Sequence, residues 1–163
     1  TYLLHKNGWS GMNIDIHQFS IDLFNYLRPD DVNLNCAVSN TNGVTEMFYQ
    51  KALSQLSTID EFQAKIAFQG DIKKSKIKSL TLDTILEKTK LTDKKIDLID
   101  IDVEGADFKV LKGFTIEKFK PELICVEIHE KQIENSEIYK YLSNFSYELV
   151  WSGVFSHIFK SKS

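Results

Sequence analysis

Segments whose apolar residues are spaced as in strands and segments spaced as in helices follow one another along the chain. Period-two alternation, or a short apolar run, predicts strands at residues 12–16, 32–38, 44–49, 96–103, 123–128, 147–151 and 154–160. Apolar positions three or four apart predict helices at residues 2–6, 21–27, 81–88, 108–112 and 133–142. The two kinds of segment alternate for most of the length, until two adjacent strands close the sequence.

Residues that interrupt regular structure mark the ends of several segments. The Asn7-Gly8 pair tolerates the left-handed backbone that closes a helix, and Pro29 disfavours helix in the residue before it. The Ser152-Gly153 pair suits the turn of a hairpin. Between residues 52 and 76 the signal is weak, and the polar and small residues there indicate a mobile excursion that contains a short helix. Such an excursion is a candidate cover for a site.

The order of the segments predicts the fold class. Strands that alternate with helices are typical of an α/β layered domain, and the closing hairpin adds an antiparallel edge. In residues 96–103 and 123–128 the apolar side chains occupy both parities, as in strands that are buried on both faces. Since 163 residues give room for one core, we expect a single domain over residues 1–163 with a mostly parallel sheet.

Composition and charge exclude several classes of protein. Hydrophobic residues make up 42% of the chain and charged residues 26%, so disorder is disfavoured. The formal net charge of -3 disfavours nucleic-acid binding, and no apolar stretch approaches the roughly 18 residues that span a membrane. Cys36 and Cys125 lie in apolar runs and are expected to be buried, free thiols. We therefore expect a soluble, cytoplasmic protein with reduced thiols.

The residues that end the predicted strands are the first candidates for a site. In open α/β sheets, ligands bind beyond the carboxyl ends of the strands, where the strand order reverses. The candidates at these ends are Asp15, Ala37, Asp102, Glu104, Glu127 and His129. Four of the six are carboxylates, and one is a histidine.

Asp15 ends a predicted strand that precedes a helix. A carboxylate in this place can accept hydrogen bonds from both hydroxyls of a ribose, as an acid does in dinucleotide-binding sheets. Asp is also a good helix N-cap. The position alone leaves both roles open.

Four acids fall within the eight residues from Asp100 to Asp107. The pattern imitates the start of a calcium-binding loop, but the twelfth position, counted from Asp100, is Leu111 and not a carboxylate. Asp100 and Asp102 could instead be the metal-holding acid pair of a nucleotide-sugar transferase. The acids could also face a polar or cationic small ligand, or Glu104 and Asp107 could simply favour the positive N-terminus of the next helix.

Glu127 and His129 lie two residues apart, hence on one face if their strand continues. A carboxylate beside an imidazole raises its basicity and supports general-base catalysis, although a lone histidine is often structural. His5, His17 and His157 lack such a partner and are predicted to be surface or packing residues. No Cys/His spacing indicates zinc, and there is no Gly-x-Gly-x-x-Gly or phosphate-loop pattern.

Five segments, in order along the chain, carry a family resemblance. The most specific is residues 96–113, IDLIDIDVEGADFKVLKG, which is followed by residues 120–127, KPELICVE. Upstream lie residues 7–15 (NGWSGMNID), 35–40 (NCAVSN) and 79–83 (SLTLD). In these segments the sequence resembles the FkbM family of S-adenosylmethionine-dependent methyltransferases. The resemblance covers nearly the whole chain and leaves out mainly residues 50–78.

The resemblance implies a Rossmann-like class I methyltransferase sheet, S-adenosylmethionine as the cofactor, and methyl transfer to a hydroxyl of a small molecule or sugar. It implies that Asp15 binds the cofactor's ribose, that Ala37 lies near the adenine, and that Asp102 lies near the methionine or methyl region.

The resemblance also implies roles on the acceptor side. His129 would be the general base that removes the hydroxyl proton. Glu127 and Glu104 would shape the site in which the acceptor binds.

The chain departs from the family pattern at two positions and lacks one element. Asp15 stands where the family usually has Glu, so the ribose contact needs a closer backbone. Asp100 stands where an uncharged or basic residue is common, and a mid-strand carboxylate is costly unless it is paired. The Gly-rich cofactor loop and the first strand before it are absent. We therefore expect a C-terminal portion of a longer enzyme, with the central strand position between strands 12–16 and 96–103 unfilled.

Two other functions fit parts of the sequence. One is a metal-dependent nucleotide-sugar glycosyltransferase that uses Asp100 and Asp102. The other is a non-catalytic, partial methyltransferase fold that acts as an interaction module. For the favoured methyltransferase we expect a small-molecule or carbohydrate acceptor, no bound metal, and no nucleic-acid or membrane partner. The sequence leaves the acceptor and the oligomeric state open.

Overall fold

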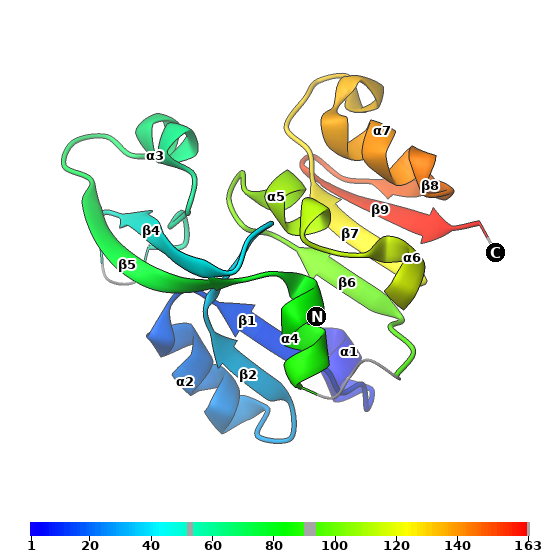
Figure 1. Ribbon diagram of the computed structural model, residues 1–163, viewed down its shortest axis with the longest axis horizontal. Helices are drawn as coiled ribbons and strands as arrows, with labels where there is room; N and C mark the ends of the chain where they lie inside the picture. The colour runs from blue at the N-terminus through cyan, green and yellow to red at the C-terminus, as the bar shows by residue number, and fades with distance from the viewer. Residues whose placement is uncertain (52–53, 90–93, 163) are drawn as a thin grey trace.

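Helices and strands alternate along the chain in the computed structural model, which describes residues 1–51, 54–89 and 94–162 (Figure 1). The helices are α1 (Tyr2–Lys6), α2 (Gln18–Leu27), α3 (Glu61–Ala67), α4 (Leu82–Lys88), α5 (Asp107–Lys112), α6 (Ile116–Phe119), the short 3-10 helix η1 (Ile133–Asn135) and α7 (Glu137–Asn144). The strands are β1 (Met12–Asp15), β2 (Val32–Asn35), β3 (Ala37–Val38), β4 (Gly43–Tyr49), β5 (Lys73–Leu80), β6 (Leu98–Ile101), β7 (Leu123–Glu127), β8 (Tyr147–Ser152) and β9 (Ser156–Ser161). No helix in these residues is long and apolar enough to cross a membrane.

The described strands form three small sheets. β1 and β2 pair in parallel, β5 lies between β3 and β4, and the remaining strands follow the order β6-β7-β9-β8. β1 and β6 each have one edge without a strand partner in the described part of the chain. The predicted closing hairpin is confirmed, because β8 and β9 pair antiparallel with a register shift between Leu149 and Trp151.

The expected mixture of strands and helices is confirmed, but parallel pairing is not in the majority. Three strand pairs are parallel (β1–β2, β3–β5 and β6–β7) and three are antiparallel (β4–β5, β7–β9 and β8–β9) in the described residues. The difference from the prediction comes largely from β5, which the sequence did not indicate and which runs antiparallel along the whole of β4.

β5 overlaps the end of the segment at residues 52–76 that was predicted to be an excursion. The short helix expected there is confirmed as α3, but the excursion ends earlier than predicted, since β5 begins at Lys73. Residues 52 and 53 of the predicted excursion lie outside the described residues. β5 alternates Lys74, Lys76 and Lys78 with smaller or apolar residues, and this period-two pattern was hidden by its high charge.

The predicted strand at residues 32–38 divides at Cys36. β2 pairs with β1, whereas β3 pairs Ala37 with Ser79 of β5. The chain therefore passes from one sheet to another within three residues. This change of partner brings the ends of β1 and β3 to the same region of the molecule.

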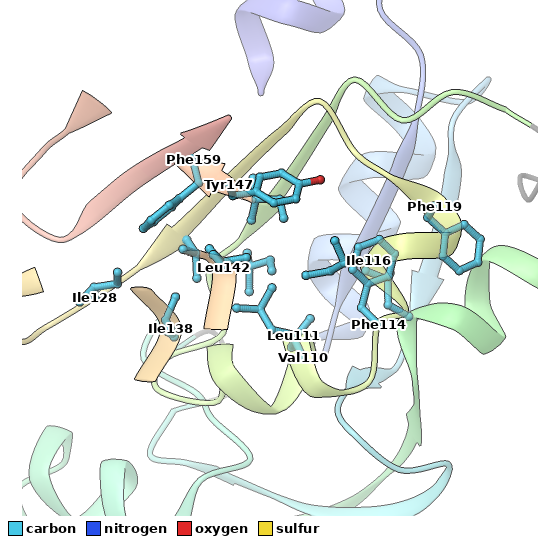
Figure 2. Packing of buried hydrophobic residues seen from close by; sticks show 14 of the residues in the cluster. Val110, Leu111, Phe114, Ile116, Phe119, Ile128, Ile138, Leu142, Tyr147 and Phe159 are labelled. Carbon is cyan, nitrogen blue, oxygen red and sulfur yellow. The ribbon is translucent and has the colours of Figure 1, made fainter. Parts of the chain in front are cut away.

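The main core lies between the four-stranded sheet and helices α5, α6 and α7 (Figure 2). Leu111 of α5, Leu142 of α7, Ile124 of β7 and Phe159 of β9 have fully buried side chains. Burial of each such side chain stabilises the fold by roughly 1.5–3 kcal/mol. The core therefore fixes β6 and β7, and with them the carboxyl ends that carry the predicted acids.

The opposite face of β6 and β7 is less covered than predicted. Asp100 is exposed although it lies in the middle of β6, and its neighbour across the strands, Cys125, is only half-buried. The prediction that both strands are buried on both faces is therefore wrong for β6. Exposure also explains how Asp100 is tolerated, because its carboxylate stays in contact with water.

The two cysteines are free thiols, as expected. Cys36 is buried, and its burial raises the pKa of the thiol. Partial burial and the nearby Asp100 carboxylate raise the pKa of Cys125 to about 12. Both sulfurs stay protonated at neutral pH, so neither is a reactive nucleophile.

Candidate active site

A cavity of about 600 Å³ lies at the carboxyl ends of β1 and β6 and along β3, and we call it the strand-end cavity. Four of the six predicted site residues line it: Asp15, Ala37, Asp102 and Glu104. The rest of its wall comes from the start of α2 and from the segment between β4 and α3. The volume lies within the range of ordinary small-molecule sites.

Asp15 is the last residue of β1. Its Oδ1 accepts a hydrogen bond from the His17 backbone N–H at 2.7 Å. The N-cap of α2 is His17, so the alternative that Asp15 is itself the helix N-cap is wrong. The second carboxylate oxygen of Asp15 has no hydrogen bond to any described residue, so it can accept one from a ligand.

Ala37 begins β3 and is almost fully buried. Together with Cys36 and Val38 it gives the strand-end cavity an apolar wall. Its methyl group offers no polar atom, so this part of the cavity suits a flat, weakly polar group.

The turn between β6 and α5 brings Asp102 and Glu104 to the cavity. Glu104 has φ 53° and Gly105 has φ +87°, so two successive residues take the left-handed conformation. A side chain at position 105 would also collide with Gln63, which explains why glycine stands there. The turn then enters α5, where the Asp107 carboxylate accepts a hydrogen bond from the Gly105 N–H at 3.1 Å.

The carboxylates of this region lie close enough to affect one another. Burial raises the pKa of both Asp102 and Glu104, and neighbouring carboxylates raise it further. Burial, reinforced by the Glu127 and Asp102 charges, raises the pKa of Asp107 to about 6. His129 acts in the opposite direction on Asp102 and Glu104. The region is therefore a cluster of carboxylates with raised pKa values beside the cavity.

Glu127 and His129 are brought together, but outside the lining of the strand-end cavity. The His129 Nε2 lies 3.7 Å from the Glu127 Oε2, and the imidazole packs against the ring of Phe155 with centroids 5.0 Å apart. Burial, followed by the Asp102 charge, raises the pKa of Glu127. The His129 side chain is 52% exposed, so it remains open to a molecule that binds beside the cavity.

The segment between β4 and α3 forms one wall of the cavity, as expected of an excursion that covers a site. Ser54, Gln55, Ser57, Thr58 and Ile59 all line the cavity. At one end the Ser54 carbonyl lies 3.1 Å from the His17 Nε2. At the other end the Thr58 hydroxyl donates to the Glu104 carbonyl at 2.8 Å. The segment thus connects the two sides of the cavity.

Several residues of the cavity were not predicted as site residues. His17 was expected to be a surface or packing residue, yet it lines the cavity next to Asp15, as do Phe19 and Ser20. Their position directly after a strand end is a signal that could have identified them. Thr58 lies in a segment without a recognisable pattern, so nothing in the sequence pointed to it.

The comparison with protein families decides the assignment. A protein-family model, described as the methyltransferase FkbM domain, matches residues 1–149 of the sequence. The chain belongs to the FkbM methyltransferase family. Membership indicates an S-adenosylmethionine-dependent methyltransferase and confirms the resemblance seen in the sequence. Comparisons with curated proteins and with solved structures gave no match.

The family assignment also separates the alternatives for the acidic run. Membership of the FkbM family favours a methyltransferase over the nucleotide-sugar glycosyltransferase that would use Asp100 and Asp102. The two acids also differ in their place, since Asp102 lines the strand-end cavity and Asp100 does not.

Proposed function

We propose that this FkbM methyltransferase transfers a methyl group from S-adenosylmethionine to a hydroxyl of a small molecule or carbohydrate. The observation that carries the proposal is the strand-end cavity, which joins Asp15 at the end of β1, Ala37 at the start of β3 and Asp102 directly after β6 in a member of a methyltransferase family. Such a cavity at the carboxyl ends of strands is the usual ligand site of α/β folds.

The donor set of the cavity fits the cofactor. The free oxygen of Asp15 can accept hydrogen bonds from the ribose hydroxyls, and the apolar wall at Ala37 suits the adenine. Asp102 also lines the cavity, and its carboxylate suits the positively charged methionine end.

The acceptor side lies around Glu104, Glu127 and His129. When bound, S-adenosylmethionine supplies an electrophilic methyl group on a sulfonium sulfur. The His129 Nε2 faces Glu127, which leaves Nδ1 to take the proton of the acceptor hydroxyl. The Glu127 carboxylate then stabilises the imidazolium, and Glu104 borders the space between this pair and the cavity.

We also propose that the three sheets are parts of one Rossmann-like sheet. β1 and β6 support this arrangement, because their ends border the same cavity although the two strands do not pair with each other. In this arrangement they flank the position of a further, central strand. Such a strand would satisfy the open backbone groups along both edges.

A labelled-methyl assay tests the proposed reaction. The complete native protein is incubated with S-adenosylmethionine labelled in the methyl group and with a panel of sugars and hydroxylated small molecules. His129→Ala is expected to lower turnover by about 100-fold or more, the usual contribution of general-base catalysis, with cofactor affinity nearly unchanged. Glu130→Ala is the control, because Glu130 is exposed and its side chain has no hydrogen bond or ion pair among the described residues.

The outcomes separate the reaction from the role of His129. Label in an acceptor hydroxyl supports the function, and label that goes only to other atoms of the acceptors contradicts O-methylation. Equal losses of turnover and cofactor affinity in His129→Ala would reject its role as the base.

A further inference from the structure

Thr58 is the buried hydroxyl in the wall of the strand-end cavity. Its side chain is 1% exposed. The hydroxyl donates a hydrogen bond to the Glu104 carbonyl at 2.8 Å and accepts one from the Asp60 N–H at 3.0 Å. The hydroxyl thus joins the segment before α3 to the β6–α5 turn, two parts of the chain that are 46 residues apart.

The backbone that presents this hydroxyl is itself fixed. The N–H and carbonyl of Thr58 exchange hydrogen bonds with Phe48 of β4, at 3.2 and 2.8 Å. Phe48 belongs to a small core with Ala64 and Phe68. Thr58 is therefore part of a packed lobe, formed by β4, α3 and the residues next to them that pack around Phe48, and not of a free loop. Its hydroxyl can for this reason hold another group in place.

The carbonyl that Thr58 holds belongs to a strained turn. A non-glycine residue is strained in the left-handed conformation because its Cβ crowds the backbone, and Glu104 adopts this conformation with φ 53°. The turn therefore depends on contacts from outside. The ion pair between Lys109 Nζ and Asp60 Oδ2, at 2.8 Å, also joins it to the lobe, but the Thr58 bond acts on Glu104 itself.

We propose that Thr58 is a positioning residue of the methyl-transfer site: its hydroxyl fixes the Glu104 backbone so that the Glu104 carboxylate faces the strand-end cavity. The inference rests on the proposed function, because that function makes Glu104 part of the acceptor side. Without the hydroxyl, the Glu104 carbonyl loses its partner and the residue relaxes towards an ordinary backbone conformation. The carboxylate then turns towards solvent.

An NMR titration of the Glu104 carboxyl tests this directly and needs no acceptor. The complete protein is labelled with ¹³C at the glutamate side chains, and the Glu104 signal is assigned with Glu104→Gln. In Thr58→Val, which keeps the shape but loses the hydroxyl, the pKa of Glu104 is expected to fall towards the ordinary glutamate value of about 4.3. The fall follows because partial burial, followed by the Asp102 and Glu127 charges, raises this pKa in the wild type.

Two further variants make the comparison specific. Thr58→Ser restores the hydroxyl and is expected to keep the wild-type pKa of Glu104. Thr45→Val is the matched control, because Thr45 lies in β4 of the same lobe and its side chain has no hydrogen bond among the described residues. A lower melting temperature of Thr58→Val without a change in the Glu104 pKa would mean a purely structural role and would overturn the proposal.

Two further outcomes also bear on the positioning role of Thr58. An equal shift in Thr45→Val, or no rescue by Thr58→Ser, would likewise overturn the positioning role. If Thr58→Val does not fold, Thr58→Ala takes its place under the same criteria, since it removes the hydroxyl without adding volume. Calorimetry with S-adenosylmethionine on the same samples tests the proposed function separately: failure of the wild type to bind contradicts that function, whereas the Glu104 pKa still decides the role of Thr58.

Discussion

At the scale of single residues, Asp107 links the site to the stability of the fold. Its side chain is 3% exposed, its Oδ1 has no partner among the described residues, and burial raises its pKa to about 6. The folded state therefore holds a proton that the unfolded chain, with a pKa of about 3.9, has already released. The stabilisation is complete below about pH 3.9 and is lost as the pH rises to about 6.

The measurable consequence is a difference between the wild type and Asp107→Asn. Two pKa units correspond to about 3 kcal/mol, so the free energy of unfolding of the wild type is expected to fall by about that much more than that of the variant between pH 4 and pH 7. Urea unfolding at several pH values measures both. The free energy of unfolding of both proteins also falls with rising pH because of three other carboxyl groups with raised pKa values, those of Asp102, Glu104 and Glu127. Only the difference between the two proteins therefore reports on Asp107. Parallel curves would contradict the account.

The site residues that sequence reasoning found share one property. Asp15, Asp102 and Glu104 lie at or next to the carboxyl ends of predicted strands, and the rule that parallel strands end at a common edge brings them together. Thr58 could not be found in this way, because its role depends on a long-range contact with Glu104. Glu127 and His129 were expected on one face of their strand, and their side chains lie 3.7 Å apart, but their place beside the cavity lining required the structure.

At the scale of elements, the end of α5 depends on a close contact with the turn after β3. A Cβ atom on Gly113 would collide with the Ser39 carbonyl oxygen. The backbone of Gly113 has an ordinary φ of -92°, which any residue can adopt. Glycine is therefore required at this position by the lack of space for a side chain and not by the backbone conformation. The close approach holds the β3–β4 turn against the helix that follows the site.

Gly113→Ala is therefore expected to lower the free energy of unfolding by roughly 1–3 kcal/mol, the usual cost of overpacking. Gly11→Ala is the matched control, since nothing lies within 4 Å of a Cβ at Gly11. The control is expected to be neutral or slightly stabilising, because alanine reduces the entropy of the unfolded chain. Chemical denaturation of both variants checks this, and equal stability of the two would show that the turn can move away.

Most elements were predictable because their apolar spacing is local. The failures have physical causes. β5 carries lysines on one face, which resembles a solvated loop until its pairing with β4 is known. The run from Val32 to Val38 looks continuous, but its two halves pair with different strands. β6 has apolar residues on both parities, although only one of its faces meets the core, because Asp100 stays exposed.

At the scale of the whole molecule, the sequence indicated the α/β class and the family but not the arrangement of the sheets. The order of strands depends on pairings such as β3 with β5, for which the separate segments carry no signal. A common cavity at strand ends was nevertheless expected, because ligands of α/β folds bind where strand ends meet, and the ends of β1 and β6 border one cavity. The central claim is therefore that this cavity binds the methyl donor.

Isothermal titration calorimetry of the complete native protein with S-adenosylmethionine tests that claim most directly. We predict one binding site in the wild type, and a loss of affinity of about tenfold or more in Asp15→Ala, since a hydrogen bond to a charged group contributes roughly 1.5–3 kcal/mol. Asp71→Ala, at an exposed acid away from the cavity lining, is expected to bind like the wild type. Absence of binding by the native protein, or wild-type affinity in Asp15→Ala, would contradict the account.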